Sequence, residues 1–450
     1  MNRIANTTRV DRLFEILVEH EGKFNRSFSF IPSENILSPL ARLAFLSDGF
    51  SRYFFDEKEV SGRWSFEGGS IIGRIQQEIL VPLFRRVGRA EHVNLHPVSG
   101  LTGMTLALAA FGGGPASRVI SVPVANGGHP DTRYVSEKLG YRVLEMPFAD
   151  WAHVDLDALS RMVRKKRPSL VYFDHATALF PLDIKVVIQT IRKAARAPIH
   201  IHVDTSHVNG LVWGGQLPNP LDCGADSYGG STHKTFPGPH KAVLFANDRQ
   251  VADRLALTSS NMISHHHIAS VVALAITLIE FVECGGETYA ARICRNAKAF
   301  ARALDDRGFQ VQGKAWGFTD NHQVWIAVPA GLDTFRAASL LFQAGLVVNP
   351  YSPLPSLGGP GLRLGVNEPT RLGLGAGDFE ALADRFADLL LAERPVAEVA
   401  HSVAELRRRH RPEFCFQDQV FEAKLVELSA AFEDCRRLMR PATRGQAQAD

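Results

Sequence analysis

Residues 200–204 read His-Ile-His-Val-Asp, and this short stretch determines the kind of fold that the chain is expected to adopt. Its length and apolar positions predict a buried β-strand that ends in a carboxylate at Asp204. Further along, residues 231–239 read Ser-Thr-His-Lys-Thr-Phe-Pro-Gly-Pro and place Lys234 among small polar groups. Ligands of parallel sheets bind at the carboxyl ends of the strands, so Asp204 and Lys234 are expected at one site.

A strand-end aspartate followed by a lysine in a Gly/Ser/Thr setting indicates pyridoxal 5'-phosphate (PLP) chemistry. The lysine amine can hold the aldehyde of PLP as an imine. The carboxylate can keep the pyridine nitrogen protonated, so that the ring accepts electrons. A single lysine in a polar loop is usually a solvated surface residue, so the prediction for Lys234 depends on the residues around it.

Strand and helix patterns alternate on both sides of Asp204. Strands are expected at residues 93–95, 119–122, 142–146, 170–173, 200–203 and 242–245, and helices at 8–20, 102–111, 155–165 and 184–195. This alternation predicts a mostly parallel sheet with helices on both faces. After a helical pattern at 268–283, strands at 323–328, 346–349 and 361–365 and helices at 378–393, 396–409 and 422–439 indicate a smaller α+β unit, with a loop at 350–360.

The chain length also predicts more than one domain, because 450 residues exceed the size at which a single core keeps growing. We predict an N-terminal helix and arm over residues 1–40, a large cofactor-binding domain over 41–285 and a small domain over 286–440. The polar residues 441–450 are expected to be a disordered tail. The large domain and the small domain should share a cleft.

Composition excludes several classes of partner. The chain has 50 Lys and Arg against 47 Asp and Glu, a net charge of +3 that is too weak to indicate nucleic acid or acidic membranes. The longest apolar stretch, Val271 to Val282, is too short to cross a bilayer, and no apolar signal core begins the sequence. Five scattered cysteines show no metal-ligand spacing and read as reduced thiols. We therefore expect a cytoplasmic protein without a metal site.

Residues 97–103, Pro-Val-Ser-Gly-Leu-Thr-Gly, run from a strand into a helix and form a candidate phosphate site. Gly100 would let the backbone approach an anion, and the helix N-terminus would offer N–H groups and positive dipole. The hydroxyls of Ser99 and Thr102 would be further donors. An ordinary helix cap explains this segment equally well.

Three more residues stand at positions where chemistry is possible. His129 follows two glycines at a strand-to-loop transition and could lie flat over a planar ring, although it could also be an ordinary polar loop residue. His207 follows Asp204 and could reach a ring hydroxyl, or be a structural histidine. Arg363 lies on an apolar strand between glycines and matches a substrate carboxylate, with a structural salt bridge as the alternative.

Together these segments resemble the serine hydroxymethyltransferase family of fold-type I PLP enzymes, over most of the chain. The matching segments, in chain order, are Ile31-Pro32-Ser33-Glu34-Asn35, Ser99-Gly100, Gly127-Gly128-His129, Asp204 to Val212, Thr232-His233-Lys234-Thr235, Gly361-Leu362-Arg363-Leu364-Gly365 and Thr370-Arg371. The resemblance implies an α/β fold with a mostly parallel seven-stranded sheet in the large domain and a smaller α+β C-terminal domain. It also implies a homodimer with shared active sites.

The resemblance assigns a role to each matching residue. Lys234 would form the internal aldimine, Asp204 would pair with the pyridinium nitrogen, His129 would stack on the ring, and His207 would lie near the ring hydroxyl. The phosphate would be held by Ser99, Gly100 and Thr102, the imine flanked by Ser231 and His233, and the substrate carboxylate bound by Ser33 and Arg363. Tyr53 would serve catalysis and substrate binding at the neighbouring subunit's cofactor.

Departures from the family pattern bear on folate binding. Folate-dependent members carry a glutamate two residues after the tyrosine that matches Tyr53, where this chain has Phe55 followed by Asp56 and Glu57. A Tyr-Tyr-Gly-Gly segment is replaced by Arg-Trp-Ser-Phe-Glu-Gly-Gly at 63–69, and a glycine-rich phosphate loop by Ser-His-His-His at 264–267. The chain looks closer to the L-threonine transaldolases, which need no folate.

The resemblance therefore predicts a transaldolase-like reaction, in which the Cα–Cβ bond of a β-hydroxy-α-amino acid is cleaved and re-formed through a glycyl quinonoid. The general base is His129 or a carboxylate near Asp56 or Glu57. The alternatives are a folate-dependent serine or α-methylserine hydroxymethyltransferase and a β-hydroxy amino acid aldolase. More distant alternatives are a catalytically silent binding module and an anion-binding module. The substrates of the predicted transaldolase-like reaction would be an amino acid and an aldehyde.

Overall fold

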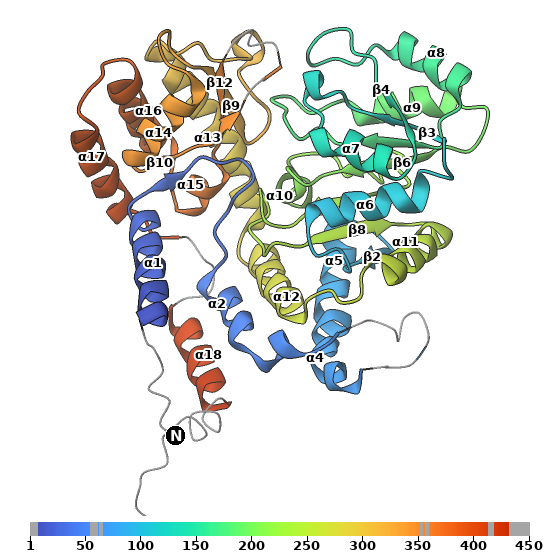
Figure 1. Ribbon diagram of the computed structural model, residues 1–450, viewed down its shortest axis with the longest axis horizontal. Coiled ribbons are helices and arrows are strands. Elements are labelled where there is room, and N and C mark those ends of the chain that lie inside the picture. The colour runs from blue at the N-terminus through green and yellow to red at the C-terminus, as the bar shows by residue number, and fades with distance from the viewer. Residues whose placement is uncertain are drawn as a thin grey trace, which may run out of the picture.

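The computed structural model describes residues 8–54, 62, 66–351, 354–355, 360–412 and 418–431. Figure 1 shows two lobes side by side, with the helices α12 (Ile268–Glu283) and α13 (Gly286–Asp306) running between them. The lobe on the right of the figure holds the large sheet, and the lobe on the left holds a smaller sheet and the C-terminal helices. The residue numbers at which we divide the chain into domains stay a prediction.

The large lobe is built on a seven-stranded sheet with the strand order β2-β8-β7-β6-β5-β3-β4. Its strands are β2 (His92–Asn94), β3 (Arg118–Ser121), β4 (Arg142–Glu145), β5 (Leu170–Phe173), β6 (His200–Asp204), β7 (Ser227–Ser231) and β8 (Ala242–Ala246). The five strands from β7 to β4 pair in parallel, while β8 is antiparallel to both of its neighbours. The predicted mostly parallel seven-stranded sheet is confirmed.

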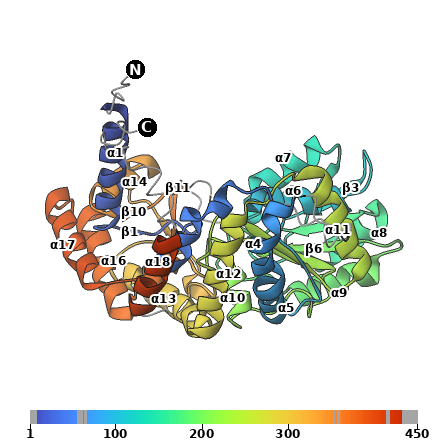
Figure 2. The ribbon, with the colours of Figure 1, turned by 90° about the horizontal axis from the view of Figure 1, so that it is seen from below.

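Alternation along the strands gives the sheet two apolar faces. Ile120, Val171 and Phe245 belong to one buried cluster, which includes side chains of α5 (Val81–Gly88), α8 (Leu156–Lys166), α9 (Ile184–Ala194) and α12. Their neighbours Val119 and Leu170 belong to a second cluster, with side chains of α6 (Gly100–Phe111) and α11 (Arg249–Met262). In Figure 2, β6 lies between α5 and α9 on one side and α6 and α7 (Pro130–Lys138) on the other. The strands are therefore buried on both faces, as expected for parallel sheets.

The strand β7 is the one member of the large sheet that the strand patterns of the sequence missed. Its residues, Ser-Tyr-Gly-Gly-Ser, include two glycines, a residue type that is depleted in strands. Gly229 and Gly230 have φ values of +148° and +150°, and a Cβ on Gly230 would come within 2.2 Å of Ser206 Oγ. Close approach to the residues after β6 therefore requires glycine here.

The small lobe contains a three-stranded antiparallel sheet of β11 (Pro350–Tyr351), β12 (Gly361–Gly365) and β9 (Gln323–Ala327), in that order. The predicted loop at 350–360 therefore begins with a two-residue strand. A two-stranded sheet joins β1 (Phe28–Ser29) in parallel to β10 (Leu346–Val347). The lobe's helices are α13, α14 (Thr334–Gln343), α15 (Asn367–Arg371), α16 (Ala376–Leu390) and α17 (Val396–Arg409).

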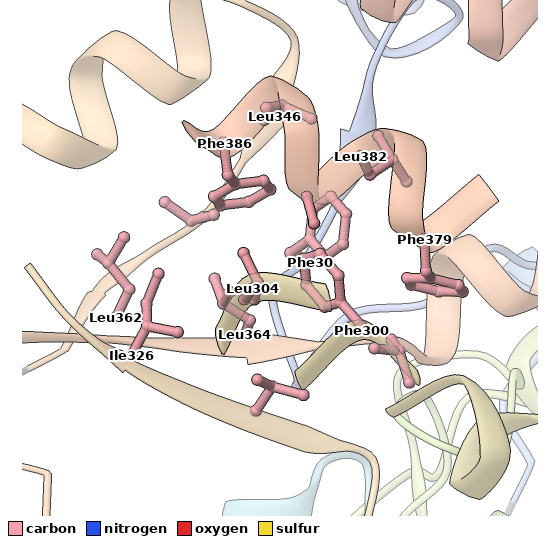
Figure 3. Packing of buried hydrophobic residues seen from close by; sticks show 14 of the residues in the cluster. Phe30, Phe300, Leu304, Ile326, Leu346, Leu362, Leu364, Phe379, Leu382 and Phe386 are labelled. Atoms are coloured by element: carbon pink, nitrogen blue, oxygen red, sulfur yellow. The ribbon is translucent and has the colours of Figure 1, made fainter. Parts of the chain in front are cut away.

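An N-terminal segment completes the core of the small lobe. Phe30, which follows β1, stacks on Phe300 at 5.2 Å between ring centroids and meets Phe386 edge-on at 5.4 Å. Figure 3 shows these three rings packed among leucines from the sheet and from α16. The pairing of β1 with β10 and the burial of Phe30 fix the course of residues 31–35, which lead toward the large lobe.

The remaining helices are α1 (Thr8–Phe24), α2 (Pro39–Arg42), α4 (Ser70–Ile75), α18 (Asp418–Ala431) and the fully buried α10 (Asn209–Trp213). The helix predicted at 422–439 begins earlier than expected, and residues 432–440 and the tail 441–450 lie outside the described residues. Within the described part of the chain, no single helix combines the length and apolar character of a membrane span. Only α12 and α13 together pass that test, and they are bent by 81°.

Candidate active site

A cavity of about 260 Å³ lies at the carboxyl ends of the central strands. It brings together these predicted site residues: Ser99, Gly100, His129, Asp204, His207, Ser231, His233 and Lys234. Four other predicted residues, Ser33, Tyr53, Thr102 and Arg363, do not line this cavity. Strand ends supply Asp204 and Ser231, while the loops that follow β3 and β7 supply His129 and Lys234.

Lys234 lies in the loop after β7, where neighbouring segments fix its backbone. Asn35 Nδ2 donates to the Lys234 carbonyl oxygen at 2.5 Å, and Thr235 Oγ1 donates to the His207 carbonyl oxygen at 2.8 Å. Burial lowers the pKa of Lys234 to about 8, with the Asp204 carboxylate opposing this shift. The lowered pKa increases the fraction of neutral amine near neutral pH, which is the form that attacks an aldehyde.

Two hydrogen bonds orient the Asp204 carboxylate at the end of β6. Oδ1 accepts from the backbone N–H of Ser206 at 2.8 Å, and Oδ2 accepts from the Tyr172 hydroxyl at 2.8 Å. Burial, together with the charge of Asp204, raises the pKa of Tyr172 well above its ordinary value. Tyr172 therefore stays protonated as a donor. The sequence alone does not single out Tyr172, because a tyrosine on β5 resembles any aromatic residue of a buried strand.

The segment predicted to hold phosphate forms the N-terminus of α6. Ser99 caps this helix, because its Oγ accepts from the Thr102 N–H at 3.1 Å and bonds to Thr102 Oγ1 at 2.8 Å. A Cβ on Gly100 would come within 2.0 Å of Ser231 Oγ, so only glycine allows this approach. The helix-cap interpretation is therefore correct, and the capped terminus still faces the cavity with N–H groups that suit an anion.

His129 is the N-cap of α7, and its ring lines the cavity. The ring Nδ1 accepts from the Asp131 N–H at 3.2 Å, while the backbone N–H of His129 donates to Asp174 Oδ2 at 3.3 Å. Burial and the charge of Lys234 lower the pKa of His129. The loop before it turns at Gly127, which has a φ of +92°. His129 is thus held as a neutral imidazole at the cavity wall.

A pair of buried histidines lies near Lys234, and one of them, His207, lines the cavity. His207 Nδ1 lies 3.4 Å from His322 Nε2, and His322 Nδ1 lies 2.6 Å from Asn321 Oδ1. Burial, then the charge of Arg363, lowers the pKa of His322 to about 3. The pKa of His207 is also lowered well below its ordinary value, by burial first and then by Lys234. His322 is not among the site residues predicted from the sequence.

Arg363 lies on β12, which is buried at the edge of the small lobe that faces these histidines. Its Nη1 donates to Thr177 Oγ1, in the loop after β5, at 2.9 Å. A Cβ on Gly365 would lie 2.5 Å from Pro32 Cα, so the segment of Ser33 packs against the end of this strand. Arg363 and the segment of Ser33 therefore approach each other beside the cavity, without lining it.

Tyr53 lies apart from the cavity and is 42% exposed. Its ring lies 4.3 Å from that of Phe66 and 5.1 Å from that of His265, between centroids. The Phe54 N–H donates to His265 Nδ1 at 3.3 Å, so the 264–267 segment packs against the Tyr53 segment. Residues 55–57 and 63–65, on which the folate prediction and one candidate base depend, lie outside the described residues.

The residues around the cavity fit PLP. Asp204 is oriented by two donors, as a carboxylate facing a protonated pyridine nitrogen requires, and Lys234 lies beside it with a lowered pKa. The close approach of Gly100 to Ser231, which a Cβ on Gly100 would prevent, brings the start of α6 and the end of β7 together at the cavity wall. PLP would be held by Lys234 at its aldehyde, by Asp204 at its nitrogen and by the α6 N-terminus at its phosphate.

Comparisons with known proteins agree with this site. A model of the family described as serine hydroxymethyltransferase matches residues 8–386. A Streptomyces sp. relative named L-threonine:uridine-5'-aldehyde transaldolase is 38% identical over 397 residues, which cover 88% of this chain and 95% of the relative. The serine hydroxymethyltransferase of Korarchaeum cryptofilum is 32% identical over 422 residues, covering 89% of this chain and 95% of its own.

A solved structure agrees as well. The crystal structure of L-threonine transaldolase from Pseudomonas fluorescens in its internal aldimine state has a TM-score of 0.82 to this chain at 27% identity, and the match covers 95% of this chain and 97% of that one. The predicted fold class is thereby confirmed. On the match to the family model and on identity over most of its length, the chain belongs to the serine hydroxymethyltransferase family of fold-type I PLP-dependent transferases.

Proposed function

We propose that this protein is a PLP-dependent L-threonine transaldolase, which exchanges the aldehyde portion of a β-hydroxy-α-amino acid for another aldehyde. The observation that carries the proposal is the single cavity in which Lys234, Asp204 and the N-terminus of α6 meet. Transaldolases occur both among the relatives of this chain and among the solved structures that resemble it, which favours this reaction within the family.

When bound, PLP supplies an electrophilic aldehyde and an electron sink for charge that develops at the amino-acid Cα. The protein's own groups then have separate tasks. Lys234 provides a neutral amine for a larger share of the time, because its pKa is lowered to about 8. Asp204, oriented by Tyr172 and by the Ser206 N–H, keeps a proton on the pyridine nitrogen.

Arg363 is proposed to bind the substrate carboxylate. Its guanidinium is held by Thr177 Oγ1, and its charge acts on the pKa of both His322 and Lys234, so it lies within electrostatic range of the cavity. A fixed carboxylate selects which bond at Cα stands perpendicular to the ring. That orientation directs the reaction to the Cα–Cβ bond.

His129 is the proposed general base for the β-hydroxyl proton. Its imidazole is neutral because burial and Lys234 lower its pKa, and a neutral ring nitrogen can take a proton. Because Nδ1 accepts from the Asp131 N–H, the proton of the neutral ring lies on Nε2, and Nδ1 carries the lone pair. Nδ1 would therefore take the β-hydroxyl proton, giving up its hydrogen bond to the Asp131 N–H.

A folate-dependent hydroxymethyltransferase is the second candidate, favoured by the relative from Korarchaeum cryptofilum. An aldolase that only cleaves β-hydroxy amino acids is the third.

We propose a homodimer with shared sites. Tyr53 lies outside the cavity of its own chain, and apolar side chains of α1 are exposed, such as that of Phe14, which is 60% exposed. A cytoplasmic location is also a proposal, supported by the cysteine spacing in the sequence.

Purified protein incubated with L-threonine and a panel of aldehydes, with and without tetrahydrofolate, tests the proposal. Transaldolase activity predicts a new β-hydroxy-α-amino acid that contains the added aldehyde, at the same rate with or without folate. Product formation that requires tetrahydrofolate would select the hydroxymethyltransferase. Release of acetaldehyde and glycine without incorporation of the acceptor would select the aldolase.

A further inference from the structure

Lys241 is a buried lysine that the proposed reaction does not use. Lys241 is the residue just before β8, and its side chain is 0% exposed. Lysines are almost never fully buried unless they are paired. The Nζ atom of Lys241 donates to the His266 carbonyl oxygen at 3.0 Å and to the Pro97 carbonyl oxygen at 3.3 Å. Lys241 therefore links two loops that are far apart in the sequence.

The groups around Lys241 are polar and buried. The rings of His96 and His266 lie 4.7 Å apart, and His266 Nε2 lies 3.1 Å from Gln76 Oε1, on the π-helical turn Gln76–Leu80. Burial, then the charge of Lys241, lowers the pKa of His96 to about 4 and that of His266 well below its ordinary value. Both histidines are therefore neutral near pH 7. Burial also lowers the pKa of Lys241 to about 7, so its amine is an uncharged hydrogen-bond donor for part of the time.

One of the two loops leads directly into the proposed phosphate site. The Pro97 carbonyl oxygen accepts from Lys241 Nζ and also from the Ala242 N–H at 3.2 Å. Two residues later, Ser99 caps α6, and Gly100 makes its close approach to Ser231. The position of Pro97 therefore sets where the first N–H groups of α6 point.

We propose that Lys241 is a positioning residue for the cofactor phosphate, which holds the Pro97–Gly100 segment, and with it the N-terminus of α6, in place. The inference rests on the proposed use of PLP. It predicts that Lys241 matters for a ligand that carries a phosphate and not for the same ligand without one. A lysine that only supported the fold would affect both ligands equally.

The test compares PLP with pyridoxal, which lacks the phosphate, as ligands of the cofactor-free full-length protein. Binding is followed by the visible absorbance that appears when the aldehyde joins the lysine. In Lys241→Met, affinity for PLP should fall by about ten-fold or more, the size expected for the loss of both hydrogen bonds to the Pro97 and His266 carbonyls, while affinity for pyridoxal stays within about two-fold. Lys193→Met, at an exposed lysine near the end of α9, is the matched control and should change neither affinity.

Lys241→Gln keeps a hydrogen-bond donor without the charge and is measured in parallel, so that the test survives if Lys241→Met does not fold. It too should lower PLP affinity selectively, by several-fold. Equal losses for PLP and pyridoxal, or an unchanged ratio of the two, would overturn the inference and leave the proposed function intact. Wild-type protein that binds neither ligand would instead overturn the proposed function.

Discussion

The hydroxyl of Tyr172 donates to Asp204 Oδ2 at 2.8 Å, across the paired strands β5 and β6. The tyrosine is fully buried, and its ring stacks on that of His202 at 5.0 Å between centroids. A rigid donor thus fixes the carboxylate on which the electron sink of the cofactor depends.

Tyr172→Phe should therefore weaken the reaction without unfolding the protein. The variant removes one charge-assisted hydrogen bond and keeps the ring, so kcat/KM should fall by about ten-fold or more. Steady-state kinetics and the absorbance spectrum of the holoenzyme measure the effect. Tyr134→Phe, at an exposed tyrosine on α7, is the control, and equal behaviour of the two variants would refute the role of Tyr172.

Gly100→Ala should interfere with phosphate binding, because the new Cβ would lie 2.0 Å from Ser231 Oγ. Overpacking of this kind usually costs about 1–3 kcal/mol, which corresponds to a loss of PLP affinity of roughly 5- to 150-fold. Adding Ser231→Ala removes the clashing oxygen and should recover part of the affinity. Absence of any recovery in the double variant would show that this contact is not the cause.

Arg363→Ala should affect the amino acid far more than the cofactor. Loss of a buried partner for a carboxylate is expected to lower kcat/KM for L-threonine by about 100-fold or more. Affinity for PLP should stay within about two-fold of that of the wild type. Arg336→Ala, at an exposed arginine of α14, serves as the control. Parallel losses in substrate and cofactor binding would contradict a role in carboxylate recognition.

Capture of PLP should depend on pH through Lys234, whose pKa is lowered to about 8. Below this pH the amine is protonated and cannot attack the aldehyde, so the rate of absorbance change should rise about ten-fold per pH unit and then level off above pH 8. Nα-acetyl-lysine, with an ordinary amine pKa of about 10.4, should keep rising beyond that point. A protein profile that also keeps rising to pH 10 would rule out the lowered pKa.

Much of the fold could be predicted from the sequence, because apolar strand patterns and helix periods are local. The strand β5 at Leu170–Phe173 and the helix α12 at Ile268–Glu283 lie where the patterns placed them. The strand β7 was missed, since its glycines are there for close approach to Ser206, a contact between segments that no local pattern encodes.

The site residues also fall into those that the sequence reveals and those that only the structure reveals. Asp204 could be found because it ends a strand pattern, and Lys234 because a reactive amine among small polar residues suits PLP. Tyr172 and Lys241 could not, because their importance comes from partners that are distant in the sequence: the Asp204 carboxylate in one case, and the Pro97 and His266 carbonyls in the other. The Ser99 hydroxyl was proposed as a phosphate donor, and the structure shows it capping α6.

The central claim is that Lys234 carries the cofactor. Borohydride reduction of the purified holoenzyme, followed by proteolysis and mass spectrometry of the peptides, tests it most directly. We predict a single peptide that bears the reduced cofactor on Lys234. A modification on any other lysine, or peptides that carry none, would contradict the account.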